Sequence, residues 1–94
     1  MIYTKATRYI INPEKTKIFV DYLYILTQKV RKLEKNLSFE YGLESRDKIV
    51  LIQRWSTTED YESFETNEEF KKELATLSKM SHKVIELFDL TITR

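Results

Sequence analysis

The stretch IVLIQRW at residues 49–55 decides the fold of this chain. Its first four residues are all aliphatic, so a strand formed here is apolar on both of its faces through its first half. A strand at the surface of a sheet alternates apolar and polar residues, whereas a strand covered on both faces does not. Residues 49–55 therefore predict a central strand that is shielded from water on both sides.

Two segments before this strand predict neighbours for it. Residues 37–44 alternate apolar and polar side chains, which is the period of a half-buried strand, and the turn at residues 45–48 joins them to residues 49–55 as a hairpin. Residues 2–11 are rich in β-branched and aromatic residues and predict another strand. One face of that strand carries Ile2, Ala6 and Ile10, and the other carries Tyr3, Tyr9 and Ile11.

The last predicted strand, at residues 84–93, also carries apolar residues on both faces. Strict alternation places Val84, Phe88, Leu90 and Ile92 on one face and Ile85 and Leu87 on the other. Because both alternations are apolar here and at residues 49–55, the sequence does not decide which face of the sheet meets the helices.

A long helix is predicted from Pro13 to about Lys35. Asn12 is a good N-cap, Pro13 suits the first helical position, and Glu14 complements the positive end of the helix dipole. Apolar residues then recur at spacings of three and four, namely Ile18, Phe19, Tyr22, Leu23, Leu26, Val30 and Leu33.

Two shorter helices are predicted between the hairpin and the last strand. Residues 56–60 combine hydroxyl caps with acidic residues and open a helix that contains Tyr61 and Phe64. Residues 66–69 repeat this capping chemistry before a third helical segment, whose apolar positions are Phe70, Leu74, Leu77 and Met80.

The composition limits the classes of protein to which the chain can belong. With 94 residues, one Gly and one Pro, we expect a single domain over residues 1–94, built of regular elements and short loops. The formal net charge of +1 provides no field that attracts nucleic acid, and no apolar run reaches the roughly 20 residues of a membrane span. The lack of Cys and the single His argue against a metal site, and we expect a cytoplasmic location.

The order β-α-β-β-α-α-β matches the split βαβ arrangement of ferredoxin-like folds. These are α+β folds in which helices cover one face of a four-stranded antiparallel sheet. The other face stays bare in a single chain. Since a large apolar surface normally marks an interface, and two-fold pairing of one surface is the commonest solution, we expect a homodimer formed through the open sheet face.

The chain resembles the antibiotic-biosynthesis monooxygenase family, in which two ferredoxin-like subunits pair into a dimeric α/β barrel. The resemblance covers essentially the whole chain and rests on INPEK at residues 11–15, LSFEYGLE at residues 37–44, and IVLIQRW followed by STTEDY at residues 49–61. It implies oxidation of a quinol-like or aromatic substrate by dioxygen, without a metal or flavin cofactor, in a pocket between the sheet and the helices. The matching pocket residues are Trp55, Tyr61 and Phe64.

Two departures from the family pattern bear on activity. Glu14 stands where members commonly carry Gly, and residues 67–70 lack the His that many members carry near the start of the third helix. The heme-degrading branch uses an Asn, a Trp and a His, and the positions that look equivalent, near residues 6–7, Phe64 and Leu74, hold none of these. We therefore do not expect heme oxygenation.

Three further residues are candidates for the site. His82 is the default proton-transfer group because its unperturbed pKa lies near neutrality, although an exposed His at a helix end is a simpler interpretation. Arg54 and Arg8 lie in otherwise apolar strands, where they could face an anionic or phenolate-like ligand. The alternative for both is a sheet edge or an ion pair across the dimer.

Two hypotheses about function follow. The first is a cofactor-independent monooxygenase that acts on a small aromatic or quinol-type substrate, with Trp55 and Tyr61 shaping the pocket. The second is a non-catalytic homodimeric module that binds a small hydrophobic ligand, with Trp55, Tyr61 and Phe64 as ordinary core residues. A cavity of about 300 Å³ or more between sheet and helices would favour the first, and a filled core the second.

Overall fold

The computed structural model describes residues 1–93, and its element order is the one that the sequence predicts. The elements are β1 (Ile2–Ile10), the 3₁₀ turn η1 (Pro13–Lys15), α1 (Thr16–Val30), β2 (Asn36–Ser45), β3 (Lys48–Trp55), α2 (Thr58–Thr66), α3 (Glu68–Lys79) and β4 (Lys83–Ile92). The strands form one antiparallel sheet in the order β2-β3-β1-β4. The ferredoxin-like α+β fold is therefore confirmed.

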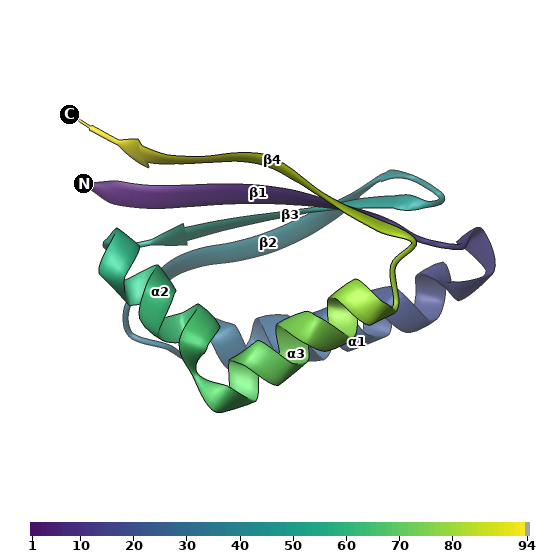
Figure 1. Ribbon diagram of the computed structural model, residues 1–94, viewed down its shortest axis with the longest axis horizontal. Helices are drawn as coiled ribbons and strands as arrows, with labels where there is room; N and C mark the ends of the chain where they lie inside the picture. Colours follow the sequence, from purple (N-terminus) through teal and green to yellow (C-terminus); the bar gives the residue numbers. More distant parts are fainter. Residues whose placement is uncertain (94) are drawn as a thin grey trace.

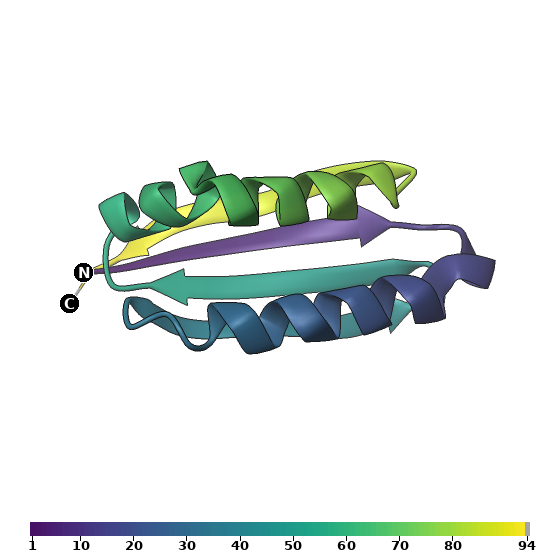
Figure 2. The same ribbon diagram turned by 90° about the horizontal axis from the view of Figure 1, so that it is seen from below.

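All three helices cover the same face of this sheet. Figure 1 shows them in one layer, with the sheet as the other layer and its second face open. Seen from below in Figure 2, α1 lies under the β2–β3 half of the sheet, whereas α2 and α3 lie under the β1–β4 half. None of the helices in residues 1–93 is both long and apolar enough to cross a membrane.

The central strand β3 shows which face of the sheet meets the helices. Ile49, Leu51 and Trp55 are buried on the helix side, whereas Val50 and Ile52 are only half-buried on the open side. The helix side is covered chiefly by the buried stripe of α1, which consists of Phe19, Leu23, Leu26 and Val30. Burial of large aliphatic and aromatic side chains between the two layers is the main source of stability.

The first helix is shorter than the predicted span from Pro13 to about Lys35. It begins with the 3₁₀ turn η1, which Asn12 caps by accepting a hydrogen bond from the Glu14 N–H at 3.0 Å, and the α-helix ends at Val30. After it, the chain reverses through three-residue turns, with a bond of 3.0 Å from the Leu33 N–H to the Val30 carbonyl. The apolar periodicity extends too far because Leu33 still packs against the core from this turn.

A β-bulge in β4 changes the faces predicted for the last strand. Thr7 pairs with Glu86 and Ala6 pairs with Phe88, which leaves Leu87 as an extra residue without a partner on β1. An extra residue reverses the alternation beyond it, because side chains alternate with a period of two. As a result, Ile85 shares the open face with Phe88, Leu90 and Ile92, and Val84 lies on the helix side, contrary to strict alternation.

Shortening one side chain of β3 tests which face of this strand forms the core. Ile49→Ala should lower the free energy of unfolding by about 2–5 kcal/mol, because the fully buried side chain leaves a cavity between sheet and helices. Ile25→Ala, on the exposed side of α1, should change it by less than about 1 kcal/mol. Urea unfolding followed by circular dichroism measures both, and equal losses would contradict this assignment.

Candidate functional site

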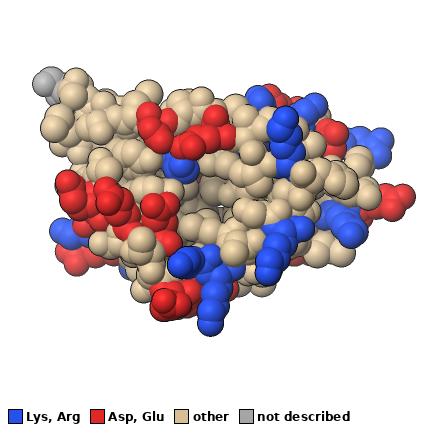
Figure 3. Space-filling view, viewed as in Figure 1, with Lys and Arg blue, Asp and Glu red and all other residues tan. Residues whose placement is uncertain are grey.

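A cleft opens between the sheet and the helices beneath the β1–β4 half of the sheet. Its volume is about 170 Å³. The space-filling view in Figure 3 shows the molecule hollowed between the sheet layer and the helix layer on the side of β4 and α3. The cleft is lined by residues of β1, β3, β4, α2 and α3, namely Lys5, Thr7, Tyr9, Gln53, Tyr61, Leu74, Ser78, Val84 and Glu86.

The strand faces explain why space remains here. On the helix side of β1 and β3, Thr7 and Gln53 stand where larger apolar residues would fill the gap, and α3 presents the small Ser78. The phenol rings of Tyr9 and Tyr61 supply flat aromatic walls. The cleft therefore combines aromatic surface with several hydrogen-bonding groups, which is the usual composition of a small-molecule site.

A charged pair stands at the mouth of the cleft. The Lys5 ammonium forms an ion pair with Glu86 across β1 and β4, and it lies 5.6 Å from the centre of the Tyr61 ring, within the range of a cation–π contact. The side chain of Lys5 is only 18% exposed, so its charge is turned inward beneath the edge of the sheet. Lys5 and Glu86 are separated by most of the chain, and only the pairing of β1 with β4 brings them together.

Carboxylates surround this ammonium group. Its hydrogen bond to Glu86 holds the pKa of Glu86 below its ordinary value. The pKa of Asp89 is raised, first by its hydrogen bond with Glu86. Burial is the main cause that raises the pKa of Tyr61 strongly, and the neighbouring Glu65 carboxylate raises it further. The Tyr61 hydroxyl therefore stays protonated and can serve as a hydrogen-bond donor.

Gln53 connects the cleft to Trp55. The two side chains lie on the helix side of β3, and the Trp55 indole Nε1–H donates a hydrogen bond of 2.9 Å to the Gln53 Oε1. Both residues are buried, and Gln53 lines the cleft while Trp55 lies behind it. An indole can only donate, so it settles which end of the Gln53 amide faces it.

The pocket residues predicted from the sequence form one aromatic cluster. Trp55 stacks on Phe64 with ring centres 4.7 Å apart, and Tyr61 meets both rings at 6.3 Å. Only Tyr61 lines the cleft. Trp55 and Phe64 instead border a second hollow of about 230 Å³ between α2 and the turn that follows α1. The aromatic cluster thus lies between the cleft, which Tyr61 lines, and the second hollow, which Trp55 and Phe64 border.

The remaining predicted residues lie away from the cleft. Arg54 is exposed on the open face of the sheet. Arg8, on the same face, forms a two-pronged ion pair with Glu44 at 2.7 and 2.9 Å, so its acidic partner belongs to its own chain. His82 is exposed before β4, and its backbone N–H donates to the Ile10 carbonyl at 2.7 Å. The structure brings none of these three side chains to the cleft.

Apart from Tyr61, none of the residues that line the cleft was predicted as a site residue, and its charged and amide groups are the ones that matter most for binding. Gln53 and Lys5 carried a detectable signal, because each is a polar residue on a strand face whose other members are mostly apolar. Glu86 carried none, since its place depends on the bulge at Leu87. Within residues 1–93, no three His, Cys, Asp or Glu side chains gather into a set that could hold a metal ion.

Comparison with known families identifies the class of protein. The sequence matches the family model of the antibiotic biosynthesis monooxygenases over residues 1–75. The chain therefore belongs to the antibiotic biosynthesis monooxygenase family. A search of curated protein sequences finds no match.

Solved structures share the fold at low sequence identity. An antibiotic biosynthesis monooxygenase superposes with a TM-score of 0.76 at 17% identity, covering 97% of this chain and 100% of its own. Rv0793 from Mycobacterium tuberculosis superposes with a TM-score of 0.79 at 12% identity, and the superposition covers 100% of both chains. SnoaB from Streptomyces nogalater, a cofactor-independent oxygenase, gives 0.82 at 12% identity, covering 99% of this chain and 94% of its own. At these identities the likeness establishes the fold alone.

The tyrosine at the floor of the cleft should make stability depend on alkaline pH. Burial raises the pKa of Tyr9 to about 12, whereas an unfolded chain releases this proton near pH 10. The folded state therefore holds the proton more tightly, and this contribution is complete below about pH 10 and is lost as pH rises toward 12. Tyrosinate absorbance should show a component near pH 12, to which Tyr3 also contributes because its pKa is raised to about 12 as well. Tyr9→Phe should reduce the amplitude of this component, and an unchanged amplitude would contradict the assignment.

Proposed function

We propose that this chain is a monooxygenase that oxidises a small, single-ring aromatic or quinol-type substrate with dioxygen in the cleft beneath β1 and β4. The observation that supports this most is the composition of the cleft, where the rings of Tyr9 and Tyr61 adjoin the amide of Gln53 and the Lys5–Glu86 pair. Flat walls suit a planar ring, and the polar groups suit its oxygen substituents. Family membership supplies the reaction class.

The volume of the cleft supports a single-ring substrate. At about 170 Å³ it falls short of the roughly 300 Å³ that would favour the monooxygenase, yet the space is not a filled core, so its volume alone does not separate the two hypotheses. A buried cavity of about 150 Å³ is known to accept benzene, so one substituted ring matches the space within this cleft. The substrate class is thus narrower than the family resemblance implies.

The proposed reaction is balanced by dioxygen alone. A para-diphenol plus one dioxygen gives the hydroxy-substituted quinone plus one water. The substrate loses four electrons. One oxygen atom of dioxygen becomes the new hydroxyl on a ring carbon, and the other leaves as water. The residues bind and orient the ring while the two layers exclude solvent. The Lys5 ammonium at the mouth of the cleft stabilises the phenolate that reacts with dioxygen, and the phenol proton leaves to solvent there.

The open face of the sheet supports a homodimer. It carries Ile85, Phe88, Leu90 and Ile92 of β4 and, on the other side of β1, Val50 and Ile52 of β3. Phe88 and Leu90 are 42% and 47% exposed. None of the helices in the described part of the chain covers this apolar surface, as Figure 1 shows. A second copy with the same surface would bury it and close two sheets face to face.

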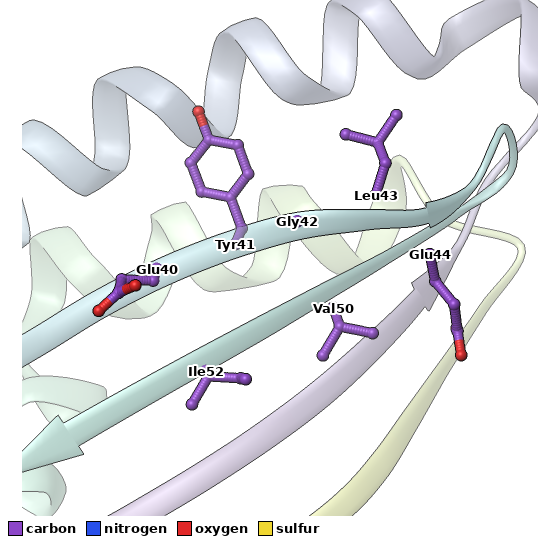
Figure 4. Close-up of a pocket in the computed structure, with 7 residues that line it drawn as sticks. All are labelled: Glu40, Tyr41, Gly42, Leu43, Glu44, Val50 and Ile52. Atoms are coloured by element: carbon purple, nitrogen blue, oxygen red, sulfur yellow. The ribbon is translucent and has the colours of Figure 1, made fainter.

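A groove of about 350 Å³ crosses this open face along β2 and β3. Figure 4 shows Tyr41 and Leu43 pointing from β2 to the side of α1, whereas Val50 and Ile52 point to the other side of β3. Gly42 pairs with Val50 but has no side chain to cover it, and a Cβ at this position would meet nothing within 4 Å. We propose that the partner subunit fills this space.

The second candidate function is a non-catalytic dimeric module that binds a small hydrophobic ligand. The tight packing of Trp55 and Phe64, which are 1% and 3% exposed, favours it because both behave as core residues. Residues 67–70 also lack the His common in the family. Under this hypothesis the cleft binds a ligand with a single ring but does not catalyse its oxidation.

Oxygen consumption separates these two candidates. The purified protein should consume dioxygen with single-ring para-diphenols and place one atom of labelled dioxygen in the product. Trp55→Ala should reduce the rate at least about tenfold, because the cleft loses the ring that holds Gln53. Tyr24→Phe, on the exposed side of α1, is the control and should have no effect. Absence of uptake across a diphenol panel, with binding retained, would favour the non-catalytic module.

The mass in solution tests the dimer. Light scattering should give twice the chain mass of 11.4 kDa. Gly42→Lys should fold, since the groove has room for the side chain, but it should give the mass of one chain because the long side chain then occupies the space that the partner subunit is proposed to fill. Leu37→Lys, on the same strand but outside the groove, is the control. A folded wild-type monomer would rule out the proposed interface.

A further inference from the structure

Gln53 is the one amide that lines the cleft, and it is 97% buried in a face of β3 that is otherwise apolar, between Leu51 and Trp55. A buried amide normally has its hydrogen-bonding groups satisfied. The Oε1 of Gln53 is satisfied by the Trp55 indole at 2.9 Å. Because the indole Nε1–H has no acceptor capacity, the opposite orientation of the amide would bring two donors face to face. The Trp55 indole therefore keeps the Gln53 Oε1 directed toward Trp55.

This arrangement leaves the Gln53 Nε2 group for the cleft. The nitrogen carries two N–H donors, and none of the side-chain hydrogen bonds of residues 1–93 uses it. It is also absent from the fully enclosed polar atoms that lack a partner, which agrees with its facing open space in the cleft. A donor held in this way, without freedom to turn, is preorganised for an acceptor atom.

We propose that the Gln53 Nε2 group is the hydrogen-bond donor that binds an oxygen of the ligand in this cleft, and that Trp55 is a positioning residue that fixes the amide for this task. The ligand class is a single flat ring that carries an acceptor oxygen, as in a phenol, a phenolate or a quinone. This inference rests on the proposed use of the cleft as the binding site. It adds a donor that the family resemblance did not assign.

The other polar groups of the cleft are less available for this role. Lys5 is engaged by Glu86, and the Tyr61 hydroxyl lies beside the Glu65 carboxylate, which raises its pKa. Gln53 is neutral and its oxygen is already used, so its donors are the ones without a competing partner in the described chain. A ring that lacks an oxygen would leave those donors unpaired, which disfavours its binding.

The indole signal provides a direct test of the geometry. The chain contains one Trp, so a single indole N–H peak appears in a ¹H–¹⁵N correlation spectrum and belongs to Trp55. Gln53→Met, which removes the acceptor and keeps a side chain of similar length, should shift this peak upfield. Gln28→Met, on the exposed side of α1, should leave it unchanged. An unshifted peak in Gln53→Met would overturn the locked amide.

Ligand discrimination tests the donor. 4-Cresol and p-xylene have nearly the same shape and differ by a hydroxyl in place of a methyl group. The dissociation constant of p-xylene divided by that of 4-cresol, measured by calorimetry, should be about tenfold lower in Gln53→Met than in the wild type. Trp55→Phe, which frees the amide, should lower the preference for 4-cresol by a smaller factor. An unchanged ratio in both variants would overturn the proposal.

A second substitution keeps the test valid if Gln53→Met fails to fold. Gln53→Glu retains an oxygen for the Trp55 indole but replaces the donor with a carboxylate. The indole peak should therefore remain at or downfield of its wild-type position, whereas binding of a quinone such as 1,4-benzoquinone should weaken about tenfold or more. Oxygen uptake distinguishes this inference from the proposed function. Uptake that persists at the wild-type rate in Gln53→Met overturns the donor and keeps the monooxygenase, whereas Gln53-dependent binding without uptake supports the donor and rejects the monooxygenase.

Discussion

Burial of one face of the central strand β3 is the constraint on which the other features of the structure depend. Ile49, Leu51 and Trp55 can leave water only if α1, α2 and α3 all cover the same side of the sheet. That requirement leaves Val50 and Ile52 on the opposite side, where none of the elements within residues 1–93 covers them. The core and the open apolar face are therefore two consequences of a single strand that is apolar on both sides.

The cleft is an interruption of that same buried face. Where β3 carries Gln53 and β1 carries Lys5 and Thr7, the two layers cannot close on apolar side chains, and a small space remains beneath β1 and β4. The aromatic cluster around Trp55 makes one wall of this space rigid. The hydrogen bond from Trp55 to Gln53 then connects the packed aromatic wall to the polar lining of the cleft. The packing of Trp55 therefore determines how Gln53 is oriented.

The bulge at Leu87 shows how one residue changes both faces of an edge strand. Beyond it, Phe88, Leu90 and Ile92 join Ile85 on the open face and enlarge the apolar surface there. On the helix side, the same strand presents Glu86 and Asp89 to Lys5. Without the extra residue, the alternation would place Ile85 with Leu87 and separate the apolar residues of β4 between the two faces.

The sequence by itself determined the order of the elements, the hairpin, the central position of residues 49–55 and the family, because periodicity and capping are local properties that a single segment expresses. The tertiary structure decided which face of β3 meets the helices, since both alternations bury apolar groups equally well. It also decided the composition of the cleft. Lys5 and Glu86 lie at opposite ends of the chain, and their contact depends on a strand register and a bulge that no local pattern encodes.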